Sequence, residues 1–218
     1  MIIAIDGPAG SGKSSTAKAV AARLGITFLD TGAMYRAITL KAMRLGVAHT
    51  DDAALEIILG RTTIAFEGSP PDVRVIMDGE DVSTAIRSAE VTGKVSDYCA
   101  RDVVRKSLVD QQRVAAQGRS VVCEGRDIGT VVFPNADVKI FMVASVEERA
   151  RRRQKDFAAM GVDKSIEELI CDIEARDHKD STRSNSPLMK AEGAIEMDTT
   201  GMTLEDQIVF IVNKAKAT

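Results

Sequence analysis

Residues 7–14, Gly7-Pro-Ala-Gly-Ser-Gly-Lys-Ser14, match the pattern G-x-x-x-x-G-K-[ST] at every fixed position. Glycines at this spacing let the backbone turn tightly, so that successive N–H groups point inward at an anion. A helix that begins near Lys13 adds the positive end of its dipole, and Lys13 supplies a mobile positive charge for the outer phosphates. The Ser14 hydroxyl is placed to ligate Mg²⁺. The stretch predicts a loop that binds a nucleoside triphosphate with Mg²⁺.

The residues around this loop favour a phosphate site over a glycine-rich turn without function. An apolar run, residues 2–5, precedes it and predicts a buried strand. Apolar residues at positions 17, 20, 21 and 24 have helical spacing, and Gly25 follows them as a C-terminal cap. Strand, loop and helix in this order do not identify the reaction, because motors, switches and kinases share them.

Further apolar runs predict the rest of an α/β fold. Residues 26–29, 121–123 and 138–143 are predicted strands, and residues 194–197 are a weaker candidate. Strands that are apolar on both faces and separated by helices indicate a five-stranded parallel sheet covered on both sides. Between residues 62 and 82, Pro70-Pro71 and Asp78-Gly79 are turn signals flanked by residues that favour strands. We predict a small antiparallel β insert there; a long decorated loop is the alternative.

The composition is that of an ordinary globular chain. Its 218 residues are 44% hydrophobic and 28% charged, with a net charge of −3. This charge argues against whole-surface attraction to a nucleic acid polymer or an anionic membrane, and neither a signal peptide nor a membrane span is expected. The three cysteines are odd in number and widely spaced, which fits reduced thiols in the cytoplasm. We expect them to be inert core residues.

Arginines that follow predicted strands indicate a second anionic ligand. The run "FLDTGAMYRA" (28–37) ends a strand at Asp30 and carries Arg36, while Arg126 follows the strand at 121–123. Loops at the carboxyl ends of parallel strands meet on one side of a sheet, so these arginines should converge near the phosphate loop. Several guanidiniums around one phosphate site suggest that two phosphorylated substrates meet there, and phosphoryl transfer needs mainly alignment and positive charge.

For several charged and apolar residues, interpretations without a role in substrate binding remain open. Asp30 could simply cap the following helix, and Met34 and Tyr35 are expected to pack rather than react. The spacing of Arg176, Asp180 and Arg183 also fits an ion-pair ladder on a helix surface. The basic run 149–155 could be a solvated helix face or a nucleic-acid patch, although it lacks interleaved aromatic residues.

Two other classes of phosphate-loop protein fit less well. A GTPase needs the guanine-binding pattern N-K-x-D, and the nearest match, residues 213–216, lacks the Asp and lies in a predicted helix. An ATPase motor would be longer, with a clear apolar run ending in Asp-Glu. The nearest candidate, residues 121–124, leads directly into Gly125-Arg126-Asp127.

The chain resembles the bacterial cytidylate kinases, which transfer the γ-phosphoryl group of ATP to CMP or dCMP. The resemblance is carried, in family order, by "IDGPAGSGKSS" (5–15), "LDTGAMYRA" (29–37), "DGEDVSTAIRS" (78–88), "VVCEGRDIGTVVFPNADVKIF" (121–141) and "EARDHKDSTRS" (174–184). These pieces are spread along nearly the whole chain, from residue 5 to residue 184. The second and fourth are much more specific than the phosphate loop.

The resemblance implies a role for each matching residue. The ATP phosphates would lie on Gly7, Pro8, Ala9, Gly10, Ser11, Gly12, Lys13, Ser14 and Ser15. The acceptor nucleotide would contact Asp30 and Thr31, and its phosphate would be held by Arg36, Arg126 and Arg183. Ser96, Arg105 and Asp127 would surround the cytosine, and Arg176 and Asp180 would reach the ribose. Lys13, Arg126, Arg152 and Arg183 would then be the catalytic cations.

The resemblance also implies a domain organisation. Residues 1–60 and 85–218 would form a phosphate-loop kinase core with acceptor-binding helices and a helical lid at about 145–180, which includes Arg152. Residues 61–84 would be the β insert of the mobile acceptor-binding region. A lid that closes only over both substrates predicts slow loss of ATP in the absence of CMP. A monomer is expected.

The chemistry of cytosine agrees with this assignment. A carboxylate such as that of Asp127 can accept from the N4 amino group, and Arg105 or Ser96 can donate to N3 or O2. Uracil has a carbonyl in place of the amino group, and an unmatched buried polar group costs roughly 1–3 kcal/mol. Two other functions stay open: a kinase of another small metabolite, such as a shikimate-type acceptor, and a non-catalytic nucleotide-dependent regulator.

Overall fold

The computed structural model describes residues 1–159 and 161–218. Its central sheet contains β1 (Ile2–Asp6), β2 (Thr27–Asp30), β6 (Val121–Gly125), β7 (Val138–Val143) and β8 (Ile195–Asp198), in the order β2-β6-β1-β7-β8. Every pairing is parallel. The predicted five-stranded parallel sheet is therefore confirmed, with the second strand one residue later than expected. The register places Asp6 beside Gly125 and Asp30 beside Glu124, so three strands end at one level.

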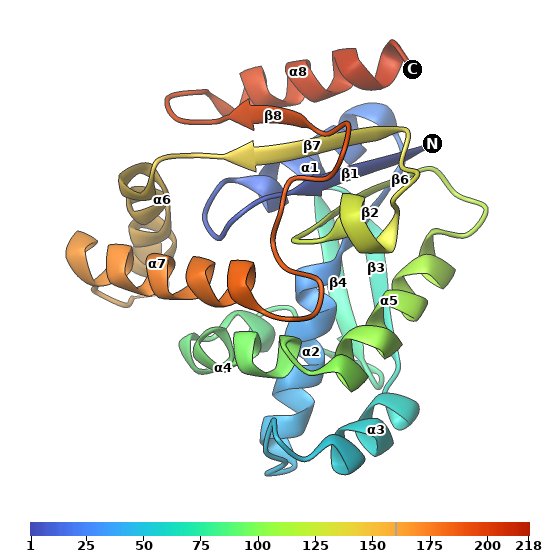
Figure 1. The fold of residues 1–218 in the computed structure, drawn as a ribbon, viewed down its shortest axis with the longest axis vertical. Coiled ribbons are helices and arrows are strands. Elements are labelled where there is room, and N and C mark those ends of the chain that lie inside the picture. Colours follow the sequence, from blue (N-terminus) through green and yellow to red (C-terminus); the bar gives the residue numbers. More distant parts are fainter. Residues whose placement is uncertain (160) are drawn as a thin grey trace.

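Helices cover both faces of this sheet (Figure 1). Ile3 and Ile5 pack with α1 (Lys13–Leu24) and α8 (Leu204–Lys216), whereas Ala4, between them, packs with α2 (Thr31–Arg44), α3 (Asp52–Arg61) and α5 (Asp102–Ala116). This alternation follows from the pleat of the strand, and both faces are buried because a parallel sheet carries helical crossovers on each side. The result is a three-layer α/β fold.

The predicted β insert is confirmed. Strands β3 (Ile64–Ser69), β4 (Asp72–Met77) and β5 (Glu80–Asp81) form a separate antiparallel sheet. Val75 and Met77 are buried against Ala37 and Leu40 of α2, so the insert packs directly on the helix that follows β2. A 3-10 turn (Ala85–Arg87) and α4 (Ala89–Cys99) then lead back towards the core.

Helices α6 (Val146–Ala159) and α7 (Ile166–Thr182) pair with one another around a small apolar cluster of their own. They lie together at one end of the molecule (Figure 1). Capping boxes begin both α7, from Ser165 to Glu168, and α8, from Thr203 to Asp206. Within residues 1–159 and 161–218, no helix is both long and apolar enough to cross a bilayer.

Candidate active site

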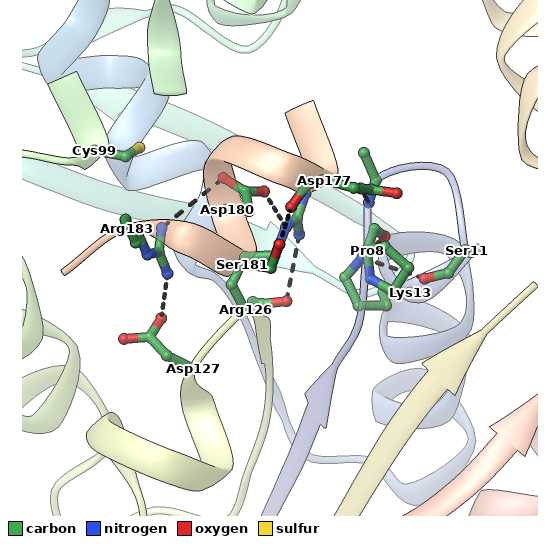
Figure 2. Close-up of polar contacts among 12 residues, drawn as sticks. Pro8, Ser11, Lys13, Cys99, Arg126, Asp127, Asp177, Asp180, Ser181 and Arg183 are labelled. Atoms are coloured by element: carbon green, nitrogen blue, oxygen red, sulfur yellow. Dashed lines mark hydrogen bonds and ion pairs between the residues drawn. The ribbon is translucent and has the colours of Figure 1, made fainter. Parts of the chain in front are cut away.

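The phosphate loop connects β1 to α1 and is shaped by two glycines. A Cβ on Gly7 would collide with the carbonyl oxygen of Met142, so the loop can cross β7 only without a side chain. Gly12 has φ 92° at the start of α1, a left-handed conformation that favours glycine. The Lys13 ammonium donates to the carbonyl oxygen of Pro8 at 2.6 Å and to the Ser11 hydroxyl at 3.3 Å (Figure 2). Lys13 therefore lies within the loop that the motif predicts.

The environment of Lys13 is unusual for a lysine. Its side chain is buried, and burial, followed by the nearby charge of Arg126, lowers its pKa from 10.5 to about 7. Glu124, at the end of β6, is the neighbouring carboxylate; burial and the charge of Asp30 raise its pKa above the usual range. An added anion would stabilise the charged form of Lys13, because its present cationic neighbours oppose that charge.

A cavity of about 880 Å³ opens in front of this loop. Gly10, Gly12, Lys13 and Ser14 form its floor, and Met202, Leu204 and Gln207 line it from the loop and helix after β8. Arg152 of α6 reaches this cavity; its guanidinium donates to the carbonyl oxygens of Ser11 at 3.2 Å and Thr199 at 2.7 Å. Its volume lies in the range typical of small-molecule sites.

A smaller cavity of about 60 Å³ adjoins the first. Residues that line it come from α2, α4, α5, α7 and the loop after β6, and they include Thr31, Arg36, Ser96, Arg105, Arg126, Asp127, Arg176, Asp180 and Arg183. These are the residues that sequence reasoning assigned to the acceptor, apart from Asp30, which lines the larger cavity. The two cavities share Gly32, Arg36, Arg126 and Arg176. The predicted residues are thus brought together at one site.

Asp180 and the arginines around it form a buried network (Figure 2). Arg126 donates from Nε to Asp180 at 2.9 Å, and the Arg183 guanidinium lies 3.9 Å from Asp180 and 4.0 Å from Asp127. Burial raises the pKa of Asp180, but the charges of Arg126, Arg176 and Arg183 outweigh it and hold that pKa below its usual range. Asp180 is only 5% exposed, so the alternative of a surface ladder is wrong.

Asp127 also pairs with Arg105 in the smaller cavity, and both side chains are buried. Arg105 lies in the first turn of α5. Helix α5 starts with Asp102, and Arg105 in its first turn contacts Asp127 in the loop after β6. The pair therefore joins two segments that are 22 residues apart in the sequence.

Arg36 and Arg176 both line the wall shared by the cavities. Arg36 donates to the Thr92 hydroxyl at 2.8 Å and to the Ile86 carbonyl oxygen at 3.2 Å. Burial lowers the pKa of both guanidiniums; for Arg176, the charges of Arg126 and Arg36 lower it further. Crowding of like charges in a buried place is the arrangement that an anionic ligand would stabilise.

Asp30 caps α2, as one interpretation of the sequence held. One carboxylate oxygen accepts from the N–H of Ala33 at 2.8 Å, and the other lies 3.1 Å from Arg87. The second oxygen faces the larger cavity together with Arg87, so capping does not exclude a role in binding.

Sequence reasoning missed several residues of the site. Arg87 and Thr92 line the larger cavity; Thr92 lies in none of the quoted segments, and Arg87 lies in the quoted segment 78–88 but was given no role. Asp177 of α7 accepts from the N–H of Ala9 at 3.4 Å and pairs with Arg149, which links α6 and α7 to the phosphate loop. Asp177 lies directly after Arg176 in the quoted segment 174–184, and only that position could have pointed to it.

The cysteines differ from one another. Cys123 is buried in β6, as expected, whereas Cys171 is exposed on α7, so the expectation that all three lie in the core is wrong. Cys99 is half-buried and lines the smaller cavity.

A nucleotide-type phosphate loop, a parallel sheet and a second arginine-rich cavity define a phosphotransferase of the phosphate-loop kinase class. The family model described as cytidylate kinase matches residues 3–217. A cytidylate kinase of Leuconostoc mesenteroides is 50% identical over 211 residues, 97% of this chain and 94% of its own. One of Geobacillus thermodenitrificans is 49% identical over 215 residues, 97% and 96% of the two chains. The chain belongs to the cytidylate kinase family.

A solved structure supports the fold alone. An uncharacterized protein from Eubacterium ventriosum aligns with a TM-score of 0.56 over 100% of this chain and 99% of that chain. Its sequence identity is 13%, so the likeness carries no inference about the substrate.

Proposed function

We propose that this member of the cytidylate kinase family transfers the γ-phosphoryl group of ATP to CMP or dCMP, giving ADP and CDP or dCDP. One observation carries the proposal: a cavity over the phosphate loop and a second, arginine-rich cavity share Arg36, Arg126 and Arg176. A donor and an acceptor bound in these cavities would place their phosphates against the same three guanidiniums. Such a shared wall aligns the two groups and neutralises their charge.

The donor is held by the phosphate loop from Gly7 to Ser15. Backbone N–H groups and Lys13 bind the phosphates, and Arg152, which already lies against the Ser11 and Thr199 carbonyls, covers the donor from α6. Arg126 and Arg183 stabilise the charge that develops on the transferred group, together with Lys13. The acceptor phosphate already carries a nucleophilic oxygen, so this site needs no dedicated general base.

The donor set near Lys13 fits Mg²⁺. Ser14 lines the larger cavity together with Glu124, and the Ser14 hydroxyl opposes the rise in the Glu124 pKa that burial causes. Among the residues that the structure describes, no cluster of three or more His, Cys, Asp or Glu could hold a metal. Mg²⁺ in such sites keeps water and phosphate oxygens as most of its ligands, so a hydroxyl and a carboxylate suffice. When bound, Mg²⁺ neutralises phosphate charge; Ser14 would ligate it and Glu124 would orient that hydroxyl.

The acceptor occupies the smaller cavity, with Asp30 and Thr31 at its entrance. Arg36, Arg126 and Arg183 bind its phosphate, Arg176 and Asp180 its ribose, and Ser96, Arg105 and Asp127 its cytosine. Asp127 is buried and paired with Arg105. This supports a role for its carboxylate as the acceptor for the N4 amino group, with Arg105 as a donor beside it.

The smaller cavity must widen to admit a nucleotide. Its volume of about 60 Å³ is far below that of ordinary ligand sites. We propose that residues 61–84 and the helices around them move with the acceptor, and that a lid at about 145–180 closes over ATP. Residues 1–60 and 85–218 form the kinase core. Closure over both substrates would exclude water from the transferred group.

A panel of acceptors tests this function. ADP release is measured with ATP, Mg²⁺ and CMP, dCMP, UMP, AMP or shikimate, and without any acceptor. We expect turnover with CMP and dCMP and very slow loss of ATP alone. Turnover only with a different acceptor supports the small-metabolite kinase, binding of ATP without turnover supports a regulator, and rapid acceptor-independent hydrolysis contradicts all three.

The same proposal includes the location, oligomeric state and partners of the enzyme. We expect a cytoplasmic monomer that acts on free nucleotides and binds neither nucleic acid polymers nor membranes. The net charge of −3 and the position of the arginines inside cavities support this expectation. Sedimentation of the purified chain alone tests the monomeric state, and sedimentation with added DNA or anionic vesicles tests binding to nucleic acid and to membranes.

A further inference from the structure

Tyr35, on α2, has a buried hydroxyl that lacks a partner. Its side chain is 7% exposed, and the hydroxyl makes no hydrogen bond to any of residues 1–159 or 161–218. A buried hydroxyl without a partner is costly, so native structures retain one mainly where something else uses it. From the sequence, Tyr35 was expected only to pack.

Two other hydroxyls in the same layer are satisfied. The Tyr98 hydroxyl donates to the Val47 carbonyl oxygen at 2.6 Å, and the Thr39 hydroxyl donates to the Tyr35 carbonyl oxygen at 2.9 Å. Tyr98 is as deeply buried as Tyr35, at 6% exposed. Burial alone therefore does not explain the unpaired hydroxyl of Tyr35.

The surroundings of Tyr35 identify what the hydroxyl faces. Tyr35 lines the smaller cavity, and the Arg105 guanidinium lies 5.2 Å from the centre of its ring. Burial raises the Tyr35 pKa, and the titratable groups around this hydroxyl are Arg105, Asp127, Cys99 and Arg183, all of which line that cavity. The hydroxyl is therefore neutral at physiological pH and can donate or accept.

Three more polar atoms from residues of this cavity are unpaired. Arg105 Nε, Arg176 Nε and Arg183 Nη2 are buried and make no hydrogen bond within the part of the chain that the structure describes. Arg105 otherwise uses its terminal nitrogens, on Asp127 and on the Cys99 carbonyl oxygen. Four residues that line one cavity, from α2, α5, α7 and the end of α7, thus each carry an unpaired polar atom.

We propose that the Tyr35 hydroxyl hydrogen-bonds the pyrimidine base of the acceptor nucleotide and is a specificity-determining residue of this enzyme. The inference rests on the proposed function, because that function places a pyrimidine beside Arg105 and Asp127. A phenol that can both donate and accept suits the edge of a pyrimidine, which presents both kinds of group. The ring of Tyr35 meanwhile supports Arg105 by stacking.

The variant Tyr35→Phe removes this hydroxyl and keeps the ring. We expect kcat/KM for both CMP and dCMP to fall about 5- to 100-fold, the range for a hydrogen bond whose buried partner is left unmatched. The KM for ATP should stay unchanged. The melting temperature of the ligand-free protein should stay equal or rise, because the variant removes an unsatisfied group.

Tyr98→Phe is the matched control. It removes a paired hydroxyl and leaves the Val47 carbonyl oxygen unmatched, so we expect a lower melting temperature and unchanged kcat/KM for CMP. Tyr35→Phe should therefore change kcat/KM for CMP without lowering the melting temperature, and Tyr98→Phe should do the reverse. A lower melting temperature for Tyr35→Phe with unchanged kcat/KM for CMP would show a purely structural role and overturn the proposal.

A measurement on the wild-type chain removes any dependence on the variant folding. The sequence contains only two tyrosines, so labelling with ¹³Cζ-tyrosine gives two NMR signals that Tyr98→Phe assigns. We expect saturation with CMP or dCMP to shift the Tyr35 signal and leave the Tyr98 signal in place. No shift of the Tyr35 signal at saturation would overturn the proposal.

Comparisons of CMP with dCMP, and of the variant with the wild-type enzyme, separate the remaining outcomes. A loss confined to CMP and absent with dCMP would place the hydroxyl on the ribose and overturn the assignment to the base. Failure of the proposed function is distinguished by the wild-type enzyme, which would then show no turnover with CMP. If wild type turns over CMP and Tyr35→Phe matches it, only the inference on Tyr35 fails.

Discussion

The donor and acceptor halves of this site are built in different ways. The donor half is one contiguous loop, residues 7–15, in which backbone N–H groups and Lys13 supply most of the recognition. The acceptor half collects side chains from α2, α4, α5, α7 and the loop after β6, and these meet only in the folded chain. A single motif therefore predicts the first half, whereas the second depends on how helices from distant parts of the sequence pack.

The halves also differ in how charge is balanced. Lys13 is a buried cation whose pKa is strongly lowered, so the donor half is ready for an anion. In the acceptor half, Asp127 and Asp180 already neutralise part of the arginine charge. We infer that an acceptor must exchange partners within this network, whereas a donor adds negative charge beside Lys13, whose pKa is lowered in part by its cationic neighbours.

Arg126 lines both cavities, so its replacement should impair both phosphoryl transfer and binding of the acceptor. For Arg126→Met we expect kcat to fall on the order of 10³-fold, because positive charge on the transferred group is lost. The KM for CMP should also rise. Steady-state ADP release measures both. Arg23→Met, which removes an exposed pair with Glu205, is the control and should keep its activity. A loss smaller than tenfold for Arg126→Met would mean that this residue only positions Asp180.

Proton uptake should distinguish the two halves. The Lys13 pKa is about 7 in the ligand-free chain, so the side chain is mostly neutral at pH 8. ATP phosphates favour the ammonium form and raise this pKa, so ATP binding at pH 8 should take up close to one proton, and at pH 6 almost none. The affinity for ATP should then fall by up to about tenfold per pH unit above pH 7.

Titration calorimetry in two buffers of different ionisation enthalpy measures this uptake. Lys13→Met should show no uptake at either pH and a kcat lower by roughly 10²- to 10³-fold. CMP binding to wild type should lack the uptake if the halves bind independently. Equal uptake on binding ATP and CMP would contradict that difference.

The acceptor half should carry the base specificity. In Asp127→Asn, the amide can accept from cytosine or donate to the uracil carbonyl. We expect the CMP/UMP ratio of kcat/KM to fall by about ten- to a hundredfold. The variant also removes the charge partner of buried Arg105, so its melting temperature should fall. An unchanged CMP/UMP ratio would show that Asp127 does not contact the base.

Much of the fold was predictable because it depends on local patterns. The phosphate loop, the strands around it, both capping boxes and the β insert each follow from a few adjacent residues. Arg36 and Arg126 were predictable as site residues because both follow strands that end on one side of a parallel sheet. Asp177 and Arg87 were not, since their positions depend on how α7 and the turn before α4 pack against the loop.

The same limit explains the individual errors. The exposure of Cys171 depends on which face of α7 meets α6, and the unpaired hydroxyl of Tyr35 appears only when its neighbours are in place. Helical periodicity marks Tyr35 as buried, but it does not show whether the hydroxyl is satisfied. Local patterns thus predict burial better than they predict partners.

The smallest expected effects compare the two capping boxes, one on each half. α8 packs on α1 behind the phosphate loop, where the Thr16 hydroxyl donates to Gln207 at 2.6 Å, whereas α7 carries Arg176 and Asp180 to the acceptor. Thr203→Ala and Ser165→Ala should each cost about 1 kcal/mol of helix stability. For Thr203→Ala the cost should appear in the global free energy of unfolding, because α8 is buried against the central sheet.

For Ser165→Ala the cost should appear mainly as faster amide exchange within α7, because α6 and α7 share a small cluster of their own and can open separately. Urea unfolding and hydrogen exchange on both variants measure the two quantities. Opening of α7 withdraws Arg176 and Asp180 from the acceptor cavity and Asp177 from the phosphate loop, so Ser165→Ala should also raise the KM values for CMP and for ATP slightly. Equal losses of global stability, with no local change in α7, would show that this helix unfolds only together with the core.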